Sequence, residues 1–114
     1  MSTNPAPAAQ TLRYVQYDSS KETQYLSAIR QLISKDLSEP YSIYVYRYFL
    51  YQWGHLCFMT LDDHDNLVGV VVSKLEPHRG GPLRGYIAML AVNEGYRGQG
   101  IGMDIYARVD GAQH

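Results

Sequence analysis

The 114-residue sequence has a single cysteine, no long apolar stretch and no excess of charge of either sign. Because Cys57 has no second cysteine to pair with, an intrachain disulfide is excluded, and a structural zinc site built on cysteines is not expected. No apolar run approaches the roughly 18 residues of a membrane-spanning helix. The formal net charge of −1 argues against a nucleic-acid-binding protein, which would carry a basic excess.

The first residues also lack the charged and apolar regions of a secretion signal. Residues 1–11 are mainly small or polar, so we expect a disordered tail there, and a second tail at 111–114. Hydrophobic residues make up 46% of the chain, enough for one packed domain over residues 12–110. We therefore expect a soluble cytoplasmic protein without a metal and without a nucleic-acid or membrane partner.

Apolar and alternating segments predict four strands, with a polar turn at 62–66 and a loop at 76–85. These strands are expected at Leu12–Tyr17, Leu56–Leu61, Leu67–Leu75 and Tyr86–Val92. The first is expected at a sheet edge because its two faces are mixed, and the second and third should form a hairpin. No helix separates the third from the fourth, which favours an antiparallel pair.

Three helices are expected. The first begins near Ser19, which has capping-box spacing to Glu22, and ends before Pro40. The second covers Ile43–Tyr51, although its aromatic and β-branched residues also suit a strand. Five of the eleven tyrosines lie within residues 41–51, which indicates burial on more than one side. The third helix is expected at Met103–Val109.

The stretch that organises the chain is the strand Tyr86–Val92 and the glycine turn that follows it. Gly98, Gly100 and Gly102 stand at alternate positions, and Arg97 precedes them. Turn N–H groups and the start of a helix attract an anion, and pyrophosphate is the natural ligand. The spacing fits neither the dinucleotide fingerprint nor the P-loop. A glycine turn that binds nothing is the alternative.

The order of elements, together with Met89-Leu-Ala-Val-x-x-x-Tyr-Arg-x-x-Gly-x-Gly102, resembles the GNAT N-acetyltransferases. Lys35–Phe49, with its Glu-Pro-Tyr-Ser, and Arg84–Val92 look like catalytic subunits of NatC-type N-terminal acetyltransferases. The resemblance covers about Leu12 to Gly102. It implies an α+β fold with a mixed, mostly antiparallel sheet flanked by helices. It also implies that acetyl-CoA is the co-substrate and that the acceptor is the α-amine of Met-(large apolar) N-termini.

The resemblance also implies roles for individual residues. Backbone groups of four strand residues would face the pantetheine and thioester: Met89, Leu90, Ala91 and Val92. The pyrophosphate would lie on Arg97, Gly98, Gln99, Gly100, Ile101 and Gly102. One wall of the peptide groove would come from Glu39, Pro40 and Tyr41, with Glu39 pairing with the substrate amine or, alternatively, simply solvated. Tyr86 occupies the position of a catalytic tyrosine, or is a core tyrosine at a strand end.

The implied partners are nascent polypeptide N-termini, the NatC auxiliary subunits and, through them, the ribosome. In the family a base on a fifth strand and a tyrosine on the next helix follow, and neither is found here. We therefore expect the N-terminal portion of the domain only, with an open strand edge, low stability without a partner and little turnover. Two alternatives stay open: a non-catalytic product that binds the auxiliary subunits, and a GNAT enzyme for another amine.

Two other sets of residues are weaker candidates. The acidic loop with Asp62, Asp63 and Asp65 lacks the spacing and the closing Glu of a calcium loop, so it does not predict a metal site. The loop histidines, which we expect at the surface, are His55, His64 and His78.

Overall fold

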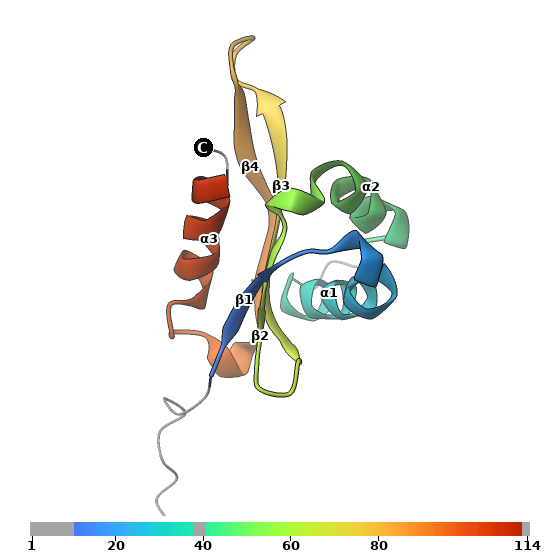
Figure 1. Ribbon diagram of the computed structural model, residues 1–114, viewed down its shortest axis with the longest axis vertical. Coiled ribbons are helices and arrows are strands. Elements are labelled where there is room, and N and C mark those ends of the chain that lie inside the picture. Colours follow the sequence, from blue (N-terminus) through green and yellow to red (C-terminus); the bar gives the residue numbers. More distant parts are fainter. Residues whose placement is uncertain (1–10, 38–40, 113–114) are drawn as a thin grey trace, which may run out of the picture.

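A computed structural model describes residues 11–37 and 41–112, and in this part of the chain four strands and three helices form the fold (Figure 1). The helices are α1 (Glu22–Leu37), α2 (Ile43–Trp53) and α3 (Ile101–Ala112), and the strands are β1 (Arg13–Gln16), β2 (Phe58–Leu61), β3 (Leu67–Pro77) and β4 (Leu83–Val92). The predicted order, one strand, two helices, three strands and a helix, is confirmed.

The strands form one sheet in the order β1-β2-β3-β4, and all three pairings are antiparallel. The expected edge position of β1 is correct. A parallel pairing, which a mixed sheet would require, does not occur among the described residues. The last strand, β4, forms the opposite edge and within the described chain pairs only with β3.

Helices α1 and α2 cover one face of the sheet and α3 covers the other (Figure 1). In α1 the apolar residues recur at three- and four-residue steps, which places them in one stripe facing the sheet. The buried members of that stripe are Leu26, Ile29, Leu32 and Ile33. The matching residues of α3, spaced four apart, are Ile101, Ile105 and Val109. Alternation along β3 sends Val70 and Val72 toward α1 and α2, and Val71 toward α3.

A glycine in β3 allows α3 to approach the sheet closely. A Cβ atom added at Gly69 would lie 2.9 Å from Ile101 Cγ2 and 3.1 Å from Ile105 Cδ1. The first distance is shorter than a carbon–carbon contact, so any side chain at Gly69 would push the helix away. The position of α3, and of the turn that leads into it, therefore depends on the absence of a side chain at Gly69.

The start of α1 differs from the capping box expected at Ser19 and Glu22. A short 3₁₀ helix, Ser19–Lys21, precedes α1, and its N-cap is Asp18. Asp18 Oδ1 accepts hydrogen bonds from the Ser20 backbone N–H at 3.0 Å and from Ser20 Oγ at 2.8 Å. Asp18, and not Ser19, is therefore the N-terminal cap, because its carboxylate accepts hydrogen bonds from two donors at once.

Several element bounds also differ from the prediction. Helix α2 continues to Trp53, and a 3₁₀ helix at Gly54–Leu56 replaces the expected start of β2. β3 and β4 extend into the expected loop as a long hairpin, because cross-strand pairing continues as far as Pro77 and Leu83. Helix α3 starts two residues earlier than expected and runs past the expected stop at Asp110-Gly111.

We predict that Ile105→Ala destabilises the protein by about 2–5 kcal/mol, because the truncation leaves a cavity between α3 and the sheet. Met103→Ala on the same helix removes a side chain that is 80% exposed, and should change stability by less than about 0.5 kcal/mol. Urea denaturation followed by circular dichroism measures both. Equal effects of the two substitutions would show that α3 does not pack as described.

We also predict that Cys57 reacts with a thiol reagent only as fast as the protein unfolds. The side chain is fully buried, and this burial raises the pKa of the thiol, so the nucleophilic thiolate is scarce in the folded state. Labelling rates with a chromogenic disulfide, in buffer and in about 8 M urea, which unfolds the protein, show how far the fold protects the thiol. Rapid stoichiometric labelling in buffer would contradict it.

Candidate functional site

The candidate site begins at a bulge in β4. Val72 pairs with Met89, but the next residue of β3, Ser73, pairs with Ile87, so Ala88 lies opposite no residue of β3. A bulge turns backbone groups out of the regular ladder and is frequent next to active sites. It lies on the edge strand of the described sheet, where a ligand can reach the backbone. The bulge was not predicted from the sequence.

Beyond the bulge, the side chains of β4 pack into the two hydrophobic cores, one on each face of the sheet. Met89 and Ala91 pack with the α1 and α2 residues, and Leu90 and Val92 pack against the α3 cluster. This leaves the backbone of residues 89–92 as the part of the strand available to a ligand. That arrangement is compatible with the predicted backbone role of these four residues.

The chain leaves β4 through a short 3₁₀ helix, Glu94–Tyr96, whose N-cap Asn93 accepts a hydrogen bond from the Gly95 N–H at 3.0 Å. Gly98 and Gly100 then adopt positive φ angles of 84° and 78°, a left-handed conformation that favours glycine. The Gly100 carbonyl accepts the Asp104 N–H at 3.0 Å, so α3 begins directly at the end of the glycine turn. Two left-handed glycines thus lie in the turn that leads directly into the helix N-terminus.

This turn matches what a pyrophosphate requires. No hydrogen bond between described residues uses the backbone N–H groups of residues 98–101. A Cβ atom added at Gly98, Gly100 or Gly102 would meet nothing within 4 Å, so open space lies beside these glycines. Free N–H donors and the positive end of the α3 dipole both favour a negatively charged group there.

The Arg97 side chain points to a different partner. Its guanidinium forms an ion pair with Asp36 in the last turn of α1, and its Nε donates to the Val92 carbonyl at 3.4 Å. Arg97 is therefore placed at the start of the turn as predicted, but its charge is already engaged by a carboxylate. Asp36, which completes this arrangement, was not singled out from the sequence, because nothing local links positions 36 and 97.

Tyr86 lies on β4 three residues before Met89. It pairs with Lys74 in the register, which places it on the sheet face covered by α1 and α2. The side chain is 36% exposed, and its hydroxyl lies 3.0 Å from His78 Nδ1 in the β3–β4 turn. The alternative of a buried core tyrosine does not fit this exposure. His78 was expected at the surface and its contact with Tyr86 was missed.

The predicted peptide wall is only partly described. Glu39 and Pro40 lie outside the described residues. Tyr41 precedes α2, packs against the core of α1 and α2, and meets Tyr46 edge-on with ring centroids 6.2 Å apart. Tyr46 is fully buried, and this burial raises the pKa of its hydroxyl. Tyr41 and Tyr86 are thus on the same side of the sheet.

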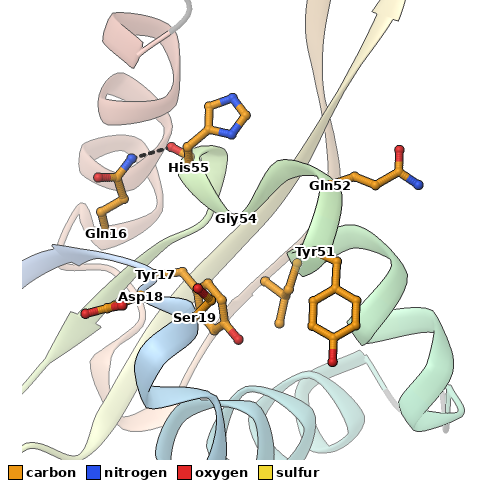
Figure 2. Close-up of a pocket in the computed structure, with 9 residues that line it drawn as sticks. Gln16, Tyr17, Asp18, Ser19, Tyr51, Gln52, Gly54 and His55 are labelled. Atoms are coloured by element: carbon orange, nitrogen blue, oxygen red, sulfur yellow. Dashed lines mark hydrogen bonds between the residues drawn. The ribbon is translucent and has the colours of Figure 1, made fainter.

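A cavity of about 750 Å³ opens away from the glycine turn, where the end of β1 meets the end of α2 (Figure 2). The Gln16 side chain donates to the His55 carbonyl at 2.6 Å on its rim. Tyr17 also lines it, and burial of the phenol, before all other causes, raises the pKa of Tyr17 to about 12. None of the residues that line the cavity belongs to β4 or to the glycine turn, so its size does not make it the better candidate.

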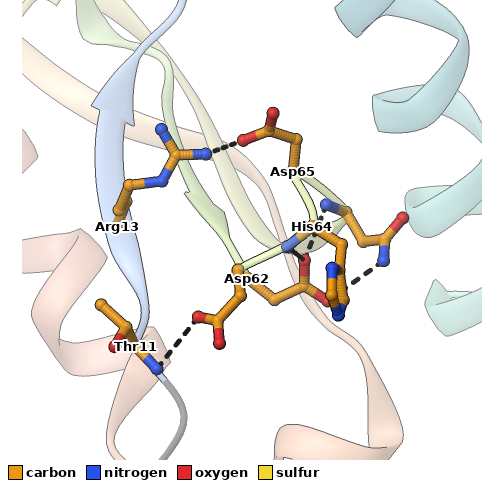
Figure 3. Close-up of polar contacts among 7 residues, drawn as sticks. Thr11, Arg13, Asp62, His64 and Asp65 are labelled. Carbon is orange, nitrogen blue, oxygen red and sulfur yellow. Dashed lines mark hydrogen bonds and ion pairs between the residues drawn. The ribbon is translucent and has the colours of Figure 1, made fainter.

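The acidic loop between β2 and β3 is closed by its own chain (Figure 3). Asp62 Oδ1 accepts the backbone N–H groups of Asn66 at 2.9 Å and His64 at 2.8 Å, and these bonds hold the pKa of Asp62 below its ordinary value. The other two aspartates bind the segment that enters β1: Asp63 accepts the Thr11 N–H, and Asp65 pairs with Arg13. No metal-binding group of three acidic, His or Cys side chains occurs in the described residues.

In residues 11–37 and 41–112, no helix is both long enough and apolar enough to span a bilayer.

Comparison with known proteins gives consistent results. N-alpha-acetyltransferase 30 of Schizosaccharomyces pombe is 62% identical over 78 residues, covering 68% of this chain and 51% of the relative. The Homo sapiens protein of the same name is 49% identical over 106 residues, covering 89% of this chain and 28% of the relative. The chain thus spans at most about half the length of these relatives.

Among solved structures, a crystal structure of the NatC complex bound to Gag peptide and CoA contains a similar chain. It is 43% identical with a TM-score of 0.82, and the match covers 90% of this chain and 66% of that chain. The model of the acetyltransferase (GNAT) family matches residues 26–109, which include most of α1, α2, the strands β2 to β4, the glycine turn and most of α3. On this match, and on the geometry of β4 and its turn, the chain belongs to the GNAT acetyltransferase family.

Proposed function

We propose that this chain provides the acetyl-CoA side of an N-terminal peptide acetyltransferase of the NatC type. The observation that carries the proposal is the glycine turn, in which free N–H groups and open space meet the start of α3 directly after β4. The likeness to N-alpha-acetyltransferase 30 proteins, at 49–62% identity, supports the same reaction.

In this proposal the backbone holds the acetyl-CoA. The N–H groups of residues 98–102 bind the pyrophosphate, and the edge of β4 at Met89–Val92 lies along the pantetheine. The bulge at Ala88 supplies a backbone N–H near the thioester carbonyl. Such a donor stabilises the negative charge that develops on the carbonyl oxygen during attack, which is a large part of catalysis in acyl transfer.

The chemistry requires two proton losses from the peptide. An α-ammonium group has a pKa near 8, so it first loses one proton and becomes a nucleophile. The nitrogen then attacks the thioester carbon. Collapse of the tetrahedral intermediate breaks the C–S bond, the nitrogen releases its second proton, like its first, to water, and the CoA sulfur takes up a proton. The Tyr86 hydroxyl, held by His78, is the candidate donor to that sulfur.

In this proposal the peptide binds on the side of the sheet that carries α1 and α2. Tyr41 offers an apolar wall for the side chain of an N-terminal Met, and the neighbouring Glu39 would pair with the amine. The preference for Met followed by a large apolar residue is what the likeness to N-alpha-acetyltransferase 30 proteins implies, and these two residues are the candidates for contact with such a substrate. Nascent chains in the cytoplasm are then the substrates, with the NatC auxiliary subunits as partners and the ribosome reached through them.

A second candidate function is binding of the auxiliary subunits without turnover. It is favoured by the outer face of α2, where Tyr44, Tyr48 and Tyr51 are 74%, 53% and 66% exposed. Tyrosine is enriched in protein interfaces because it combines a large apolar surface with a polar group. Turnover in the assay below separates the two functions.

We predict that Gly100→Ala weakens binding of CoA by about tenfold, since a left-handed alanine costs about 1–2 kcal/mol and the turn would relax away from the ligand geometry. Gly102→Ala is the matched control. Its Cβ also enters open space, but its φ is not in the left-handed region and the Arg-x-x-Gly-x-Gly/Ala pattern accepts alanine there. Isothermal titration with CoA measures both. Equal affinities of the two variants would exclude a role for the left-handed turn.

We predict that the chain, mixed with acetyl-CoA and a Met-Leu peptide, transfers acetyl to the peptide only slowly, in keeping with the little turnover expected from its sequence, and that Tyr86→Phe lowers this kcat by about 10²-fold with little change in KM. Tyr106→Phe removes an exposed hydroxyl from α3 and should change neither value. Labelled acetyl-CoA gives the rates. CoA binding and capture of the auxiliary subunits without turnover would favour the second candidate, and an unchanged kcat in Tyr86→Phe would remove this tyrosine from the mechanism.

A further inference from the structure

The side chain of Arg97 connects two parts of the fold that are far apart in sequence. Its Nε donates to the Val92 carbonyl at the end of β4, and its Nη2 contacts Asp36 Oδ1 in the last turn of α1. The gap that remains between α1 and the turn is about 30 Å³, little more than a water molecule needs. The start of the glycine turn is therefore held against α1 at short range.

The burial of the two partners indicates which one depends on the other. The Asp36 side chain is 13% exposed and the Arg97 side chain 54% exposed. A carboxylate in the last turn of a helix also meets the negative end of the helix dipole. Asp36 is therefore costly to leave without a cation, and the cost of a mostly buried unpaired carboxylate keeps the guanidinium in place.

We propose that Arg97 acts on acetyl-CoA as a positioning residue, through Asp36, and not by direct contact of its guanidinium with phosphate. The pair fixes where the turn leaves β4, so that the N–H groups of residues 98–102 converge on one point. This inference rests on the proposed function, since it assumes that the turn binds the pyrophosphate of CoA. Asp36 becomes a residue of the site although it touches no ligand.

The two roles of Arg97 make opposite predictions for Asp36. If the guanidinium binds phosphate directly, removal of the neighbouring carboxylate frees a cation and removes an anion near a polyanionic ligand, so CoA binds as tightly or more tightly. If Arg97 positions the turn, removal of the carboxylate releases the turn and CoA binds more weakly. The sign of the change in affinity therefore separates them.

The test compares Asp36→Asn with Glu94→Gln in the full chain. Glu94 is an exposed carboxylate beside the same small gap, but it is not ion-paired with Arg97 among the described residues. Its substitution therefore removes the same charge without breaking the Asp36–Arg97 ion pair. Titration with CoA should show an affinity about five- to tenfold lower for Asp36→Asn, and an equal or higher affinity for Glu94→Gln. An equal or higher affinity for Asp36→Asn would overturn the proposal.

A charge exchange gives a second, independent outcome. Arg97→Asp alone should abolish measurable CoA binding, and the double variant Asp36→Arg/Arg97→Asp should regain affinity to within about threefold of the unmodified chain, because the ion pair is restored in reverse. Direct phosphate binding predicts no such recovery. A double variant that binds no better than Arg97→Asp would therefore reject the positioning role.

Amide chemical shifts in the ligand-free protein keep this inference separate from the proposed function. Asp36→Asn should move the Gly98 and Gly100 amide resonances, and Glu94→Gln should not. If the unmodified chain binds no CoA but these shifts occur, the proposed function is wrong and the Asp36–Arg97 pair still positions the turn. If CoA binds and the two resonances do not move, the pair does not position the turn and the proposed function is kept.

Discussion

The close packing of α3 on β3 is the contact on which the rest of the site depends. It requires Gly69, whose missing side chain leaves room for Ile101 and Ile105. Since Ile101 is also the first residue of α3, the same contact fixes the helix N-terminus beside the end of β4. The eight residues between Val92 and Ile101 must then bridge two fixed points, and the left-handed glycines give this short connection backbone conformations that other residues rarely adopt.

This geometry divides the work between side chains and backbone. From Met89 to Val92 every side chain contributes to one of the two cores, so the strand can offer a ligand only its edge and its bulge. The turn likewise offers N–H groups and not charged side chains, because the guanidinium of Arg97 is paired with Asp36. A site built in this way tolerates changes of side chain wherever the backbone path is kept. It is sensitive to the few positions that define that path.

Local patterns in the sequence predicted the order of the elements, the apolar stripe of α1 and the glycine turn, because each depends on residues within a few positions of one another. Features that depend on distant residues were not predictable in this way. Examples are the Asp36–Arg97 pair and the register that leaves Ala88 unpaired. The β3–β4 hairpin was expected to be shorter because prolines and glycines mark a loop, whereas the pairing of Pro77 with Leu83 extends the ladder to the edge of the turn.

The ion pair between α1 and the glycine turn joins positions 61 residues apart. Closing so long a loop costs chain entropy that only the assembled sheet and both helix layers can offset. The contact that orients the turn is therefore present only where α1 and the turn both lie against the sheet. A short peptide that carries β4, the turn and α3 has the glycines and the helix start, but it lacks the contact that orients them. In the proposed function, recognition of the ligand therefore depends on the whole domain and not on the turn alone.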